Sequence, residues 1–361
     1  MRVARLLALV LVVLLVPAPP ATAAEKLDRK QLKQISDLAR RWFEARPKTH
    51  FDAWDRKTRL ALLEEAKAFG AVPEGSLEVV VDTMWKALKK KWPKVKEAID
   101  TPYGKATWIQ SGSGGPKKGL VIGMHGGGVG AGSAGEAAGK WKLPKTMQMF
   151  PQGIRLIHDT WNSVHGERFL LSLIEIAKVQ YEIDPDRVYA MGFSMGGTGS
   201  WFMAGRHPDL LAGAIPAHGV LMAEGGTKVK DPDAVGAMQH GFLPNARNLA
   251  VYFYTGSEDV NCEPGTFIKG WRMIEALRKD DPDGWKHIRF QCHEGIAHAF
   301  PPGEPQAGFE YVRAFKRDTF PKTLVWEYGV PVWPPRDDED KVGRLEKQWF
   351  YWLHCAFPKD Y

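Results

Sequence analysis

A serine between two glycines carries the clearest chemical signal in the chain. Residues 192–196 read Gly-Phe-Ser-Met-Gly, which fits the pattern G-x-S-x-G, in which a strand turns sharply into a helix and lifts the serine hydroxyl clear of the sheet. The apolar residues 188–191 supply the strand, and residues 198–205 can form the helix. Small residues at both ends of the motif prevent collisions in so tight a turn. We predict that Ser194 is a nucleophile; a plain glycine-rich turn is the alternative.

A second glycine-rich stretch suits the stabilisation of negative charge. Residues 125–128 read His-Gly-Gly-Gly and follow an expected strand at 120–124. An attacked carbonyl oxygen becomes negative and is stabilised by two fixed N–H groups. We expect these donors to be the N–H of Met195 and that of Gly126 or Gly127. Glycine-rich loops also bind phosphates, but the Lys-Ser/Thr that a P-loop requires does not follow here.

A serine nucleophile needs a histidine base, and the base needs an orienting carboxylate. In the strand–turn–helix arrangement the carboxylate follows the serine along the chain, and the histidine comes last. The apolar stretch 249–254 leads into Glu258 and Asp259. We choose Asp259 as the carboxylate and keep Glu258 as the alternative.

Two histidines compete for the role of base. The expected strand 287–291 leads into His293 and then, past a glycine that lets the loop fold back, into His298. We predict that His298 is the base and that His293, nearer the strand end, is structural. His125 is also expected to be structural. His218 follows another strand and could line the cleft, but no catalytic role is predicted for it.

The three cysteines form no metal-binding pattern, since neither C-x-x-C nor a Cys/His cluster occurs. Cys262 lies just past Asp259, and Cys292 lies just before His298. If the acid and base loops meet, these two cysteines are neighbours, and export to an oxidising compartment permits a disulfide. We therefore predict a Cys262–Cys292 disulfide, and we expect no metal and no cofactor.

The elements that must position these groups follow from the pattern of apolar residues. From about residue 100, short apolar runs alternate with helical stretches, which predicts βαβ units and a mainly parallel sheet flanked by helices. The expected strands are residues 120–124, 153–157, 187–191, 211–215, 249–254 and 287–291. A helix is expected at 169–179, a strand-like segment at 323–326 and a closing helix at about 345–353.

Ahead of the sheet, residues 25–98 indicate a small helical unit. Apolar residues recur there at spacings of three and four, which is typical of amphipathic helices. They are Leu32, Ile35, Leu38 and Trp42, and further on Leu77, Val81, Met84 and Leu88. We predict three parts: a signal peptide at 1–24, this helical unit at 25–98, and a catalytic domain with a C-terminal extension at 99–361.

The first residues are typical of a removable targeting segment. Arg2 and Arg5 precede the apolar run 6–16, which is shorter than the roughly 20 residues that span a bilayer. Small residues at 21–23 then offer a cleavage site, as in a secretory signal peptide. An N-terminal membrane anchor is the alternative. We expect a secreted or periplasmic protein without stable membrane insertion.

Composition excludes few classes of protein. The chain has 361 residues, of which 44% are hydrophobic and 25% charged, as in soluble globular proteins. Its formal charge of +7 includes a run of lysines between residues 86 and 96. Such a run can bind polyanions, but a solvated helix face is the simpler interpretation. Since no nucleic-acid motif accompanies it, no nucleic-acid partner is expected.

The motif and its flanks resemble a known group. Residues 183–197, with the sequence IDPDRVYAMGFSMGG, resemble secreted esterases of the polyhydroxybutyrate-depolymerase and feruloyl-esterase-like branch of the α/β-hydrolases. The resemblance covers roughly residues 101–315 and implies an α/β-hydrolase fold and carboxylesterase activity. That branch often has another residue after the His-Gly of the oxyanion loop, where this chain has Gly-Gly. The same core occurs in serine exopeptidases and dienelactone-hydrolase-like enzymes.

These observations predict a serine hydrolase that cleaves a small-molecule or polymer ester through Ser194, His298 and Asp259 and an acyl-enzyme. Trp161 and Trp201 are candidates for a substrate pocket, with core packing as the alternative. A serine exopeptidase with the same triad is the first rival function. A non-catalytic binding protein on a hydrolase scaffold is the second, and the filled triad positions weigh against it.

Overall fold

The computed structural model describes residues 27–44, 56–69, 76–92, 94–127, 132–141, 143–154, 161–221, 228–236, 243–327, 349–351 and 353–354. The predicted signal peptide and Cys355 lie outside these ranges, as does Gly128 of the glycine-rich stretch. In the part of the chain that the structure describes, no helix is both long and apolar enough to cross a membrane.

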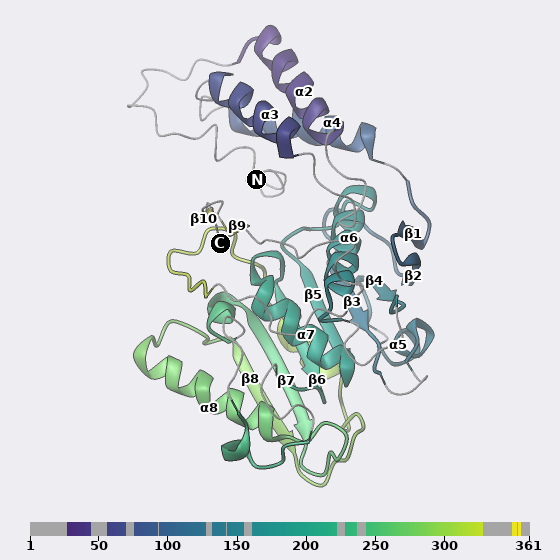
Figure 1. Ribbon diagram of the computed structural model, residues 1–361, viewed down its shortest axis with the longest axis vertical. Coiled ribbons are helices and arrows are strands. Elements are labelled where there is room, and N and C mark those ends of the chain that lie inside the picture. The colour runs from purple at the N-terminus through teal and green to yellow at the C-terminus, as the bar shows by residue number, and fades with distance from the viewer. Residues whose placement is uncertain are drawn as a thin grey trace.

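A large sheet forms the centre of the molecule (Figure 1). Over the described residues it has eight strands in the order β1-β2-β4-β3-β5-β6-β7-β8. The pairs β1–β2 and β2–β4 are antiparallel, and all pairs from β4 to β8 are parallel. The strands are β1 (Ala98–Thr101), β2 (Gly104–Ser111), β3 (Leu120–Met124), β4 (Met147–Pro151), β5 (Val188–Phe193), β6 (Gly213–Ala217), β7 (Ala250–Gly256) and β8 (Ile288–His293).

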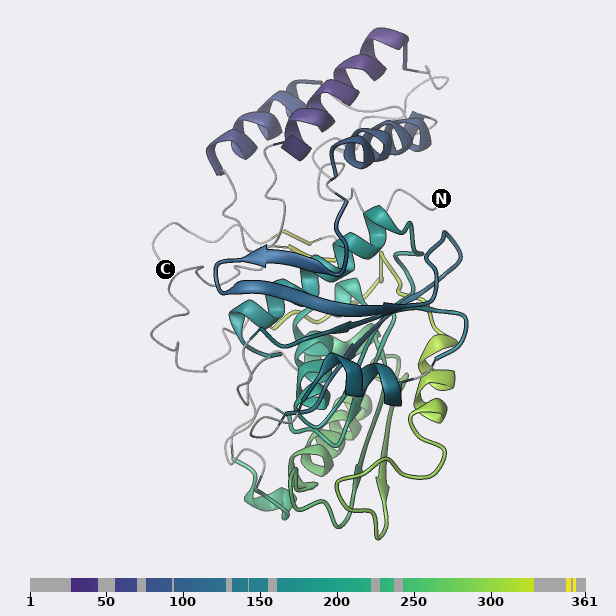
Figure 2. The same ribbon diagram turned by 90° about the vertical axis from the view of Figure 1, so that its right-hand side faces the viewer.

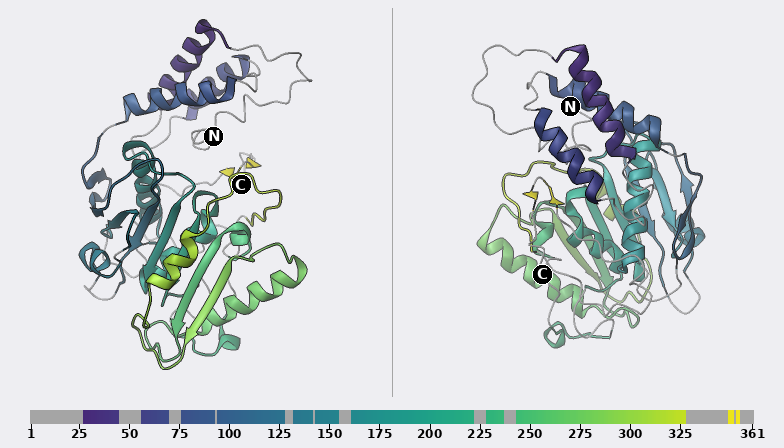
Figure 3. Two further views of the ribbon diagram at one scale, coloured as in Figure 1. Left: turned by 180° about the vertical axis from the view of Figure 1, so that it is seen from behind. Right: turned by 45° about the horizontal axis from the view of Figure 1, so that its top comes forward.

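Helices cover both faces of this sheet. On one face, α6, α7 and α8 share an apolar core with the strands; on the other, α5 and α9 do so, and the rear view in Figure 3 shows α9 there. The bounds are α5 (Ala134–Lys140), α6 (Val164–Gln180), α7 (Met195–Arg206), α8 (Gly265–Asp280) and α9 (Gln306–Arg313), with short 3₁₀ turns at Pro208–Leu210, Pro232–Ala234 and Pro244–Asn248. This arrangement confirms the predicted α/β-hydrolase fold.

Burial on both faces explains why the central strands could be found in the sequence. Successive side chains of a strand point to opposite faces. In β3, Ile122 therefore enters the core under α6 to α8, while its neighbour Val121 enters the core under α5 and α9. A strand that is covered on both sides is apolar without interruption, and that pattern predicted β3, β5, β6 and β7 to within a few residues. β8 was also expected to within a few residues, although it is the edge strand and mostly exposed.

The N-terminal helices form a separate apolar cluster at one end of the molecule (Figure 2). They are α2 (Arg29–Glu44), α3 (Arg56–Phe69) and α4 (Leu77–Lys91). Near the end of α4, Lys89 pairs with Glu182 at 2.8 Å, and the backbone N–H of Val95 donates to the Gln180 side chain. Both contacts lie at the end of α6 that leads into the start of β5. The helical cluster therefore contacts the end of the sheet at which β5 begins, opposite the end at which β5 terminates.

One strand prediction is displaced along the chain. The strand expected at 153–157 is instead β4, at Met147–Pro151, and residues 155–157 lie outside the described residues. Met147, Met149 and Phe150 are fully or almost fully buried, so this segment is the one that both faces of the sheet cover. Gly153 already lies in the following loop, where its N–H donates to the ring of His125.

The C-terminal predictions are wrong for a different reason. Residues 323–327 form no strand, because their backbone groups bond to side chains: Thr323 O accepts from Arg247 and Asn248, and Glu327 is held by Asn245. The closing helix expected at 345–353 is contradicted by two short antiparallel strands, β9 (Trp349–Phe350) and β10 (Leu353–His354). The aromatic residues there favour extended structure.

Candidate active site

The turn between β5 and α7 holds Ser194 in a strained conformation. Its φ of 60° and ψ of −120° are unusual for a residue other than glycine. A Cβ on Gly192 would lie 2.4 Å from the backbone of Gly196, and one on Gly196 would lie 2.2 Å from Met124 O, so both positions require glycine. The motif therefore has the strand–turn–helix context that a serine nucleophile needs.

The oxyanion loop lies directly against this turn. A Cβ on Gly126 would lie 3.6 Å from Ser194 Cβ, and one on Gly127 would lie 2.6 Å from the sulfur of Met195. Met195 is the first residue of α7, and the first N–H groups of a helix have no acceptor within it. The structure thus brings the three predicted oxyanion-hole residues next to Ser194.

His125 fixes the orientation of this loop. Its Nε2 accepts a hydrogen bond from Gly153 N–H at 3.0 Å, so its Nδ1 carries the proton and donates to Gly126 O at 2.6 Å. Burial lowers the pKa of His125, which favours this neutral form. Because a trans peptide directs its C=O and N–H oppositely, the N–H of Gly127 is turned away from the ring.

Neither tryptophan proposed for the substrate pocket is exposed. Trp161 and Trp201 are both fully buried. Trp161 donates its indole N–H to His125 O at 2.9 Å, and so supports the oxyanion loop from behind. Trp201 packs against Phe253 in the core. The prediction that they line a pocket is therefore wrong, and core packing, the alternative, is observed.

An aromatic wall stands beside the predicted base instead. The half-buried ring of Phe193 lies 4.7 Å from the ring of His298 and 4.7 Å from that of Phe300. The Lys140 ammonium lies 5.8 Å from the centre of the Phe193 ring. Phe193 is the variable second residue of the serine motif, and so the motif itself could have drawn attention to it.

Asp259 is buried at the end of β7 and accepts hydrogen bonds on both oxygens. Oδ1 accepts from the backbone N–H groups of Asn261 and Cys262 at 2.9 and 2.8 Å. Oδ2 accepts from Nδ1 of His298 at 2.8 Å. Burial alone would raise the pKa of Asp259, but hydrogen bonds from His218 and His298 outweigh it and hold that pKa well below its usual range. The contacts of Asp259 with the described residues thus favour its ionised form.

The two alternative residues of the acid and base loops lie elsewhere. Glu258 is exposed, and its backbone N–H bonds to Ile296 O. The His293 ring packs against Tyr254 with a centroid distance of 5.8 Å. Neither side chain contacts the Asp259–His298 pair within the described residues, so the structure brings together the pair that the sequence favoured.

A second histidine shares the same carboxylate oxygen, and the sequence did not assign it this position. His218, at the end of β6, donates from Nδ1 to Asp259 Oδ2 at 2.8 Å and is fully buried. The rings of His218 and His298 lie 5.7 Å apart, almost perpendicular to one another. The available signal was a histidine directly after a buried strand of the sheet.

The hydroxyl of Ser194 has a thiol as its close neighbour. The side chain of Cys262 lies close enough to that of Ser194 for the hydroxyl to lower the pKa of the thiol, whereas no hydrogen bond joins Ser194 to His298 among the residues that the structure describes. Catalytic hydrogen bonds are often long before substrate binds and tighten in the complex. The ring of Phe193, next in sequence to Ser194, touches both His218 and His298, which keeps the base beside the nucleophile turn.

The predicted disulfide is not formed. Cys262 and Cys292 are both free thiols. Although their loops are neighbours, Cys262 is buried against Ser194, while the side chain of Cys292 on β8 is exposed. The two thiols therefore occupy different surroundings.

We predict a large difference in reactivity between these thiols. Burial and the nearby Asp259 carboxylate raise the pKa of Cys262 to about 12, so it stays a protonated thiol that reacts slowly. In a Cys355→Ser background, a thiol reagent such as DTNB should modify one cysteine quickly in the native protein and a second only after unfolding. Cys292→Ser should remove the fast phase. A fast native reaction mapped to Cys262, or a Cys262–Cys292 peptide in a non-reducing digest, would contradict this prediction.

By residue type and distance, His218, Asp259 and His298 could also hold a metal ion, since their ligand atoms all lie within 4.8 Å of one another. The same atoms satisfy each other as hydrogen-bond partners. Both Nδ1 atoms point at Oδ2, and the arrangement therefore needs no ion to hold it together.

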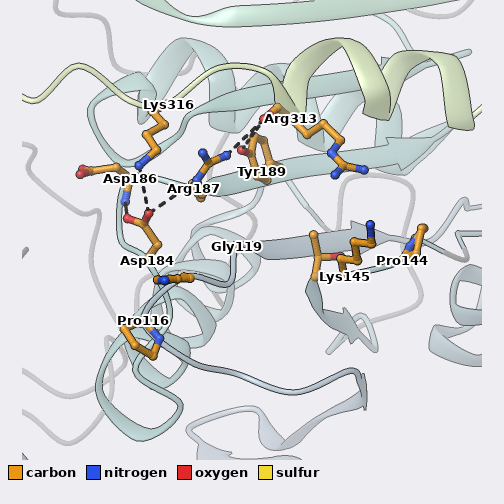
Figure 4. A pocket seen from close by; sticks show the side chains of 12 residues that line it. Pro116, Gly119, Pro144, Lys145, Asp184, Asp186, Arg187, Tyr189, Arg313 and Lys316 are labelled. Atoms are coloured by element: carbon orange, nitrogen blue, oxygen red, sulfur yellow. Dashed lines mark hydrogen bonds and ion pairs between the residues drawn. The ribbon is translucent and has the colours of Figure 1, made fainter.

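A cavity of about 710 Å³ lies at the end of the sheet where β3 and β5 begin (Figure 4). Its lining includes Gly119 and Arg187, which come just before β3 and β5, whereas Ser194 follows β5. Asp184 lies between Arg187 and Lys316, at 3.6 and 3.5 Å from their charged nitrogens. This basic cavity is thus separate from the nucleophile turn.

Comparison with known proteins gives one family. A family model described as "Dienelactone hydrolase family" matches residues 141–327. No curated protein matches the chain.

Solved structures give weaker similarities. A thermostable esterase is 18% identical, with 61% of this chain and 62% of that chain covered and a TM-score of 0.44. An acetyl xylan esterase from Aspergillus awamori is 13% identical, with 60% and 97% covered and a TM-score of 0.41. A putative dipeptidyl aminopeptidase IV from Bacteroides ovatus is 12% identical, with 60% and 33% covered and a TM-score of 0.43. The chain thus spans less than two thirds of two of these proteins.

Proposed function

This chain belongs to the dienelactone hydrolase family, and from that premise and the geometry around Ser194 we propose that it hydrolyses carboxylic esters through a serine acyl-enzyme. One observation carries the proposal. A serine on a strained turn between β5 and α7 lies beside a glycine loop, while His298, bonded to the buried Asp259, packs against Phe193 of the same turn.

In the proposed reaction, His298 Nε2 accepts the proton of the Ser194 hydroxyl as the oxygen attacks the ester carbonyl. Asp259 accepts the hydrogen bond from His298 Nδ1, which keeps Nε2 unprotonated in the resting state and stabilises the imidazolium that forms. The negative carbonyl oxygen receives hydrogen bonds from Met195 N–H and a glycine N–H of the oxyanion loop.

The tetrahedral intermediate then collapses and expels the alcohol, which takes the proton from His298. Water attacks the resulting acyl-Ser194 with His298 again as base, and the carboxylic acid leaves. Each half-reaction returns His298 to its neutral form, so the cycle consumes only ester and water.

One feature supports a substrate that brings an apolar or aromatic group. Phe193 and Phe300 form a half-buried aromatic surface beside His298, and aromatic rings offer large contact areas to such groups.

We further propose that residues 1–24 direct export, so that the ester is met outside the cytoplasm; the support is the basic start and short apolar run at 6–16.

A fluorophosphonate probe tests the proposal, because it reacts with an activated serine. We expect one adduct, located by peptide mass spectrometry at Ser194, and hydrolysis of p-nitrophenyl acetate that the probe abolishes. A matched panel of esters and aminoacyl p-nitroanilides separates the rival function: faster turnover of the anilides would identify a peptidase. The absence of any adduct at Ser194 in the folded protein would refute the serine mechanism.

A further inference from the structure

The proposed reaction assigns no role to His218, yet this residue contacts Asp259, the carboxylate of the proposed triad. Its Nδ1 donates to Asp259 Oδ2 at 2.8 Å, and both side chains are completely buried. The backbone N–H of His218 donates to Tyr254 O at 2.9 Å, which fixes the histidine to β7. Its φ of 48° lies in the left-handed region, where residues other than glycine are uncommon.

We infer that His218 is a positioning residue that holds the Asp259 carboxylate in the orientation in which it meets His298. The inference rests on the proposed function, since it assigns His218 to the same triad. It names a part of the site that neither the serine motif nor the chain order of the triad reveals.

The hydrogen bonds of Asp259 support this role. Its carboxylate accepts two backbone N–H groups on Oδ1 and the two imidazole N–H groups on Oδ2. His298 approaches from a loop and retains some exposure, whereas the side chain of His218 has none. His218 is therefore the more rigid of the two donors. Without His218, the only side chain bonded to Oδ2 would be His298, which is the residue that Asp259 has to orient.

His218 Nε2 is buried and has no hydrogen-bond partner among the described residues, although buried polar atoms usually have one. A proton on this nitrogen would have no acceptor among the described residues, so the contact that defines the surroundings of the ring is the one to Asp259. Its one side-chain hydrogen bond is the one to Asp259.

Sharing one oxygen between two imidazoles also changes the electrostatics of the base. The titratable groups around His218 are Asp259, His298 and Tyr254, with which it has direct contacts, and His293, whose pKa is lowered by burial and by His218. The N–H of His218 partly neutralises Oδ2. Its removal would leave more negative charge facing His298 and would favour the protonated base.

The test compares His218→Leu, which lacks the donor, with His218→Asn, whose amide can place an N–H near the position of Nδ1 and whose backbone tolerates a left-handed conformation. For Leu we expect kcat to fall about 10- to 100-fold, as when a partner that orients a functional histidine is removed. We expect KM to stay within about threefold, and the acid limb of the kcat/KM profile to rise by about 0.5–1 pH unit. Asn should restore most of both.

His287→Leu is the matched control, because His287 lies in the turn before β8, at the opposite end of the sheet; its kcat and pH profile should not change. If His218→Leu does not fold, His218→Gln replaces it: the longer amide is polar but misplaces the donor, so this variant should be slower than Asn.

Three results would overturn the inference. The first is a folded His218→Leu or His218→Gln variant in which kcat and the acid limb are unchanged. The second is a His218→Asn variant whose kcat and acid limb are changed as much as those of His218→Leu or His218→Gln. The third is activity that a chelator abolishes and a divalent metal restores, because the two histidines and Asp259 would then be ligands. Fluorophosphonate labelling, run in parallel, separates the two proposals. A labelled Ser194 with unaffected His218 variants refutes only the role of His218, whereas an unlabelled wild type refutes both.

Discussion

Ser194→Ala is expected to lower kcat on p-nitrophenyl acetate by about 10⁴- to 10⁶-fold, because the group that forms the covalent intermediate is removed. KM should change little, since the hydroxyl contributes to the transition state more than to ground-state binding. The remaining activity should come from the oxyanion loop, which the substitution leaves in place. Steady-state kinetics with active-site titration provide the measurement.

Ser200→Ala is the matched control for this loss. Ser200 lies on α7, the helix that begins directly after Ser194, and is also a buried serine, but its hydroxyl donates to Gly196 O at 2.9 Å. We expect this variant to keep kcat within about threefold and to lose about 1 kcal/mol of stability. A Ser194→Ala protein with more than about a tenth of wild-type activity would refute the assignment. Cys262→Ser in the same protein would show whether the neighbouring thiol supplied that activity.

The parts of the site that the sequence predicted are those fixed by local geometry. The turn at Ser194 needs glycines at 192 and 196 because the neighbouring backbone leaves no space for a Cβ, and this requirement is written in the sequence as a motif. Asp259 and His298 could be chosen because each follows a parallel strand of the sheet, and the carboxyl ends of such strands lie at one end of the sheet.

The parts that the sequence did not predict depend on where a side chain points. Cys262 and Cys292 are placed symmetrically around the acid and base in sequence, but one faces Ser194 and the other is exposed. His218 reaches Asp259 only because β6 lies beside β7 in the sheet. No spacing along the chain encodes either fact.

The C-terminal segment shows a further limit. Residues 323–326 have the composition of a strand, yet Arg247 and Asn248 bind the backbone carbonyl of Thr323. Apolar periodicity cannot report such bonds, because the partners are polar side chains more than seventy residues away in sequence. Propensity is a weak signal where tertiary hydrogen bonds compete with a sheet.

Asp259→Asn should affect stability in a pH-dependent way. The folded-state pKa of Asp259 lies below its usual range, so its ionised form stabilises the fold at pH values above the pKa of the unfolded chain. This contribution is lost as the pH falls through the folded-state pKa. The variant should therefore melt at a lower temperature than the wild type near neutral pH, and the difference should shrink on acidification. A difference that grows as the pH falls would contradict the ionised state assigned to Asp259.

The larger effect of Asp259→Asn is expected in catalysis, with kcat about 10³- to 10⁴-fold lower. The reason is that the amide changes which ring nitrogen of each histidine carries the proton. The amide oxygen can still accept the backbone N–H groups at Oδ1, which directs the NH₂ group at the two Nδ1 atoms that now donate to Oδ2. Donors would then face donors. Each histidine that stays beside the amide must move its proton to Nε2, and His298 in that form cannot accept the proton of Ser194.

A double variant measures how much of this loss depends on His218. In His218→Leu/Asp259→Asn, His298 alone faces the amide and must adopt the unproductive tautomer, so kcat should fall at least as far as in Asp259→Asn. Asp281→Asn is the control, because Asp281 accepts from Arg247 away from the site and its loss should leave kcat unchanged. An Asp259→Asn enzyme within tenfold of the wild type would show that Asp259 does not orient the base.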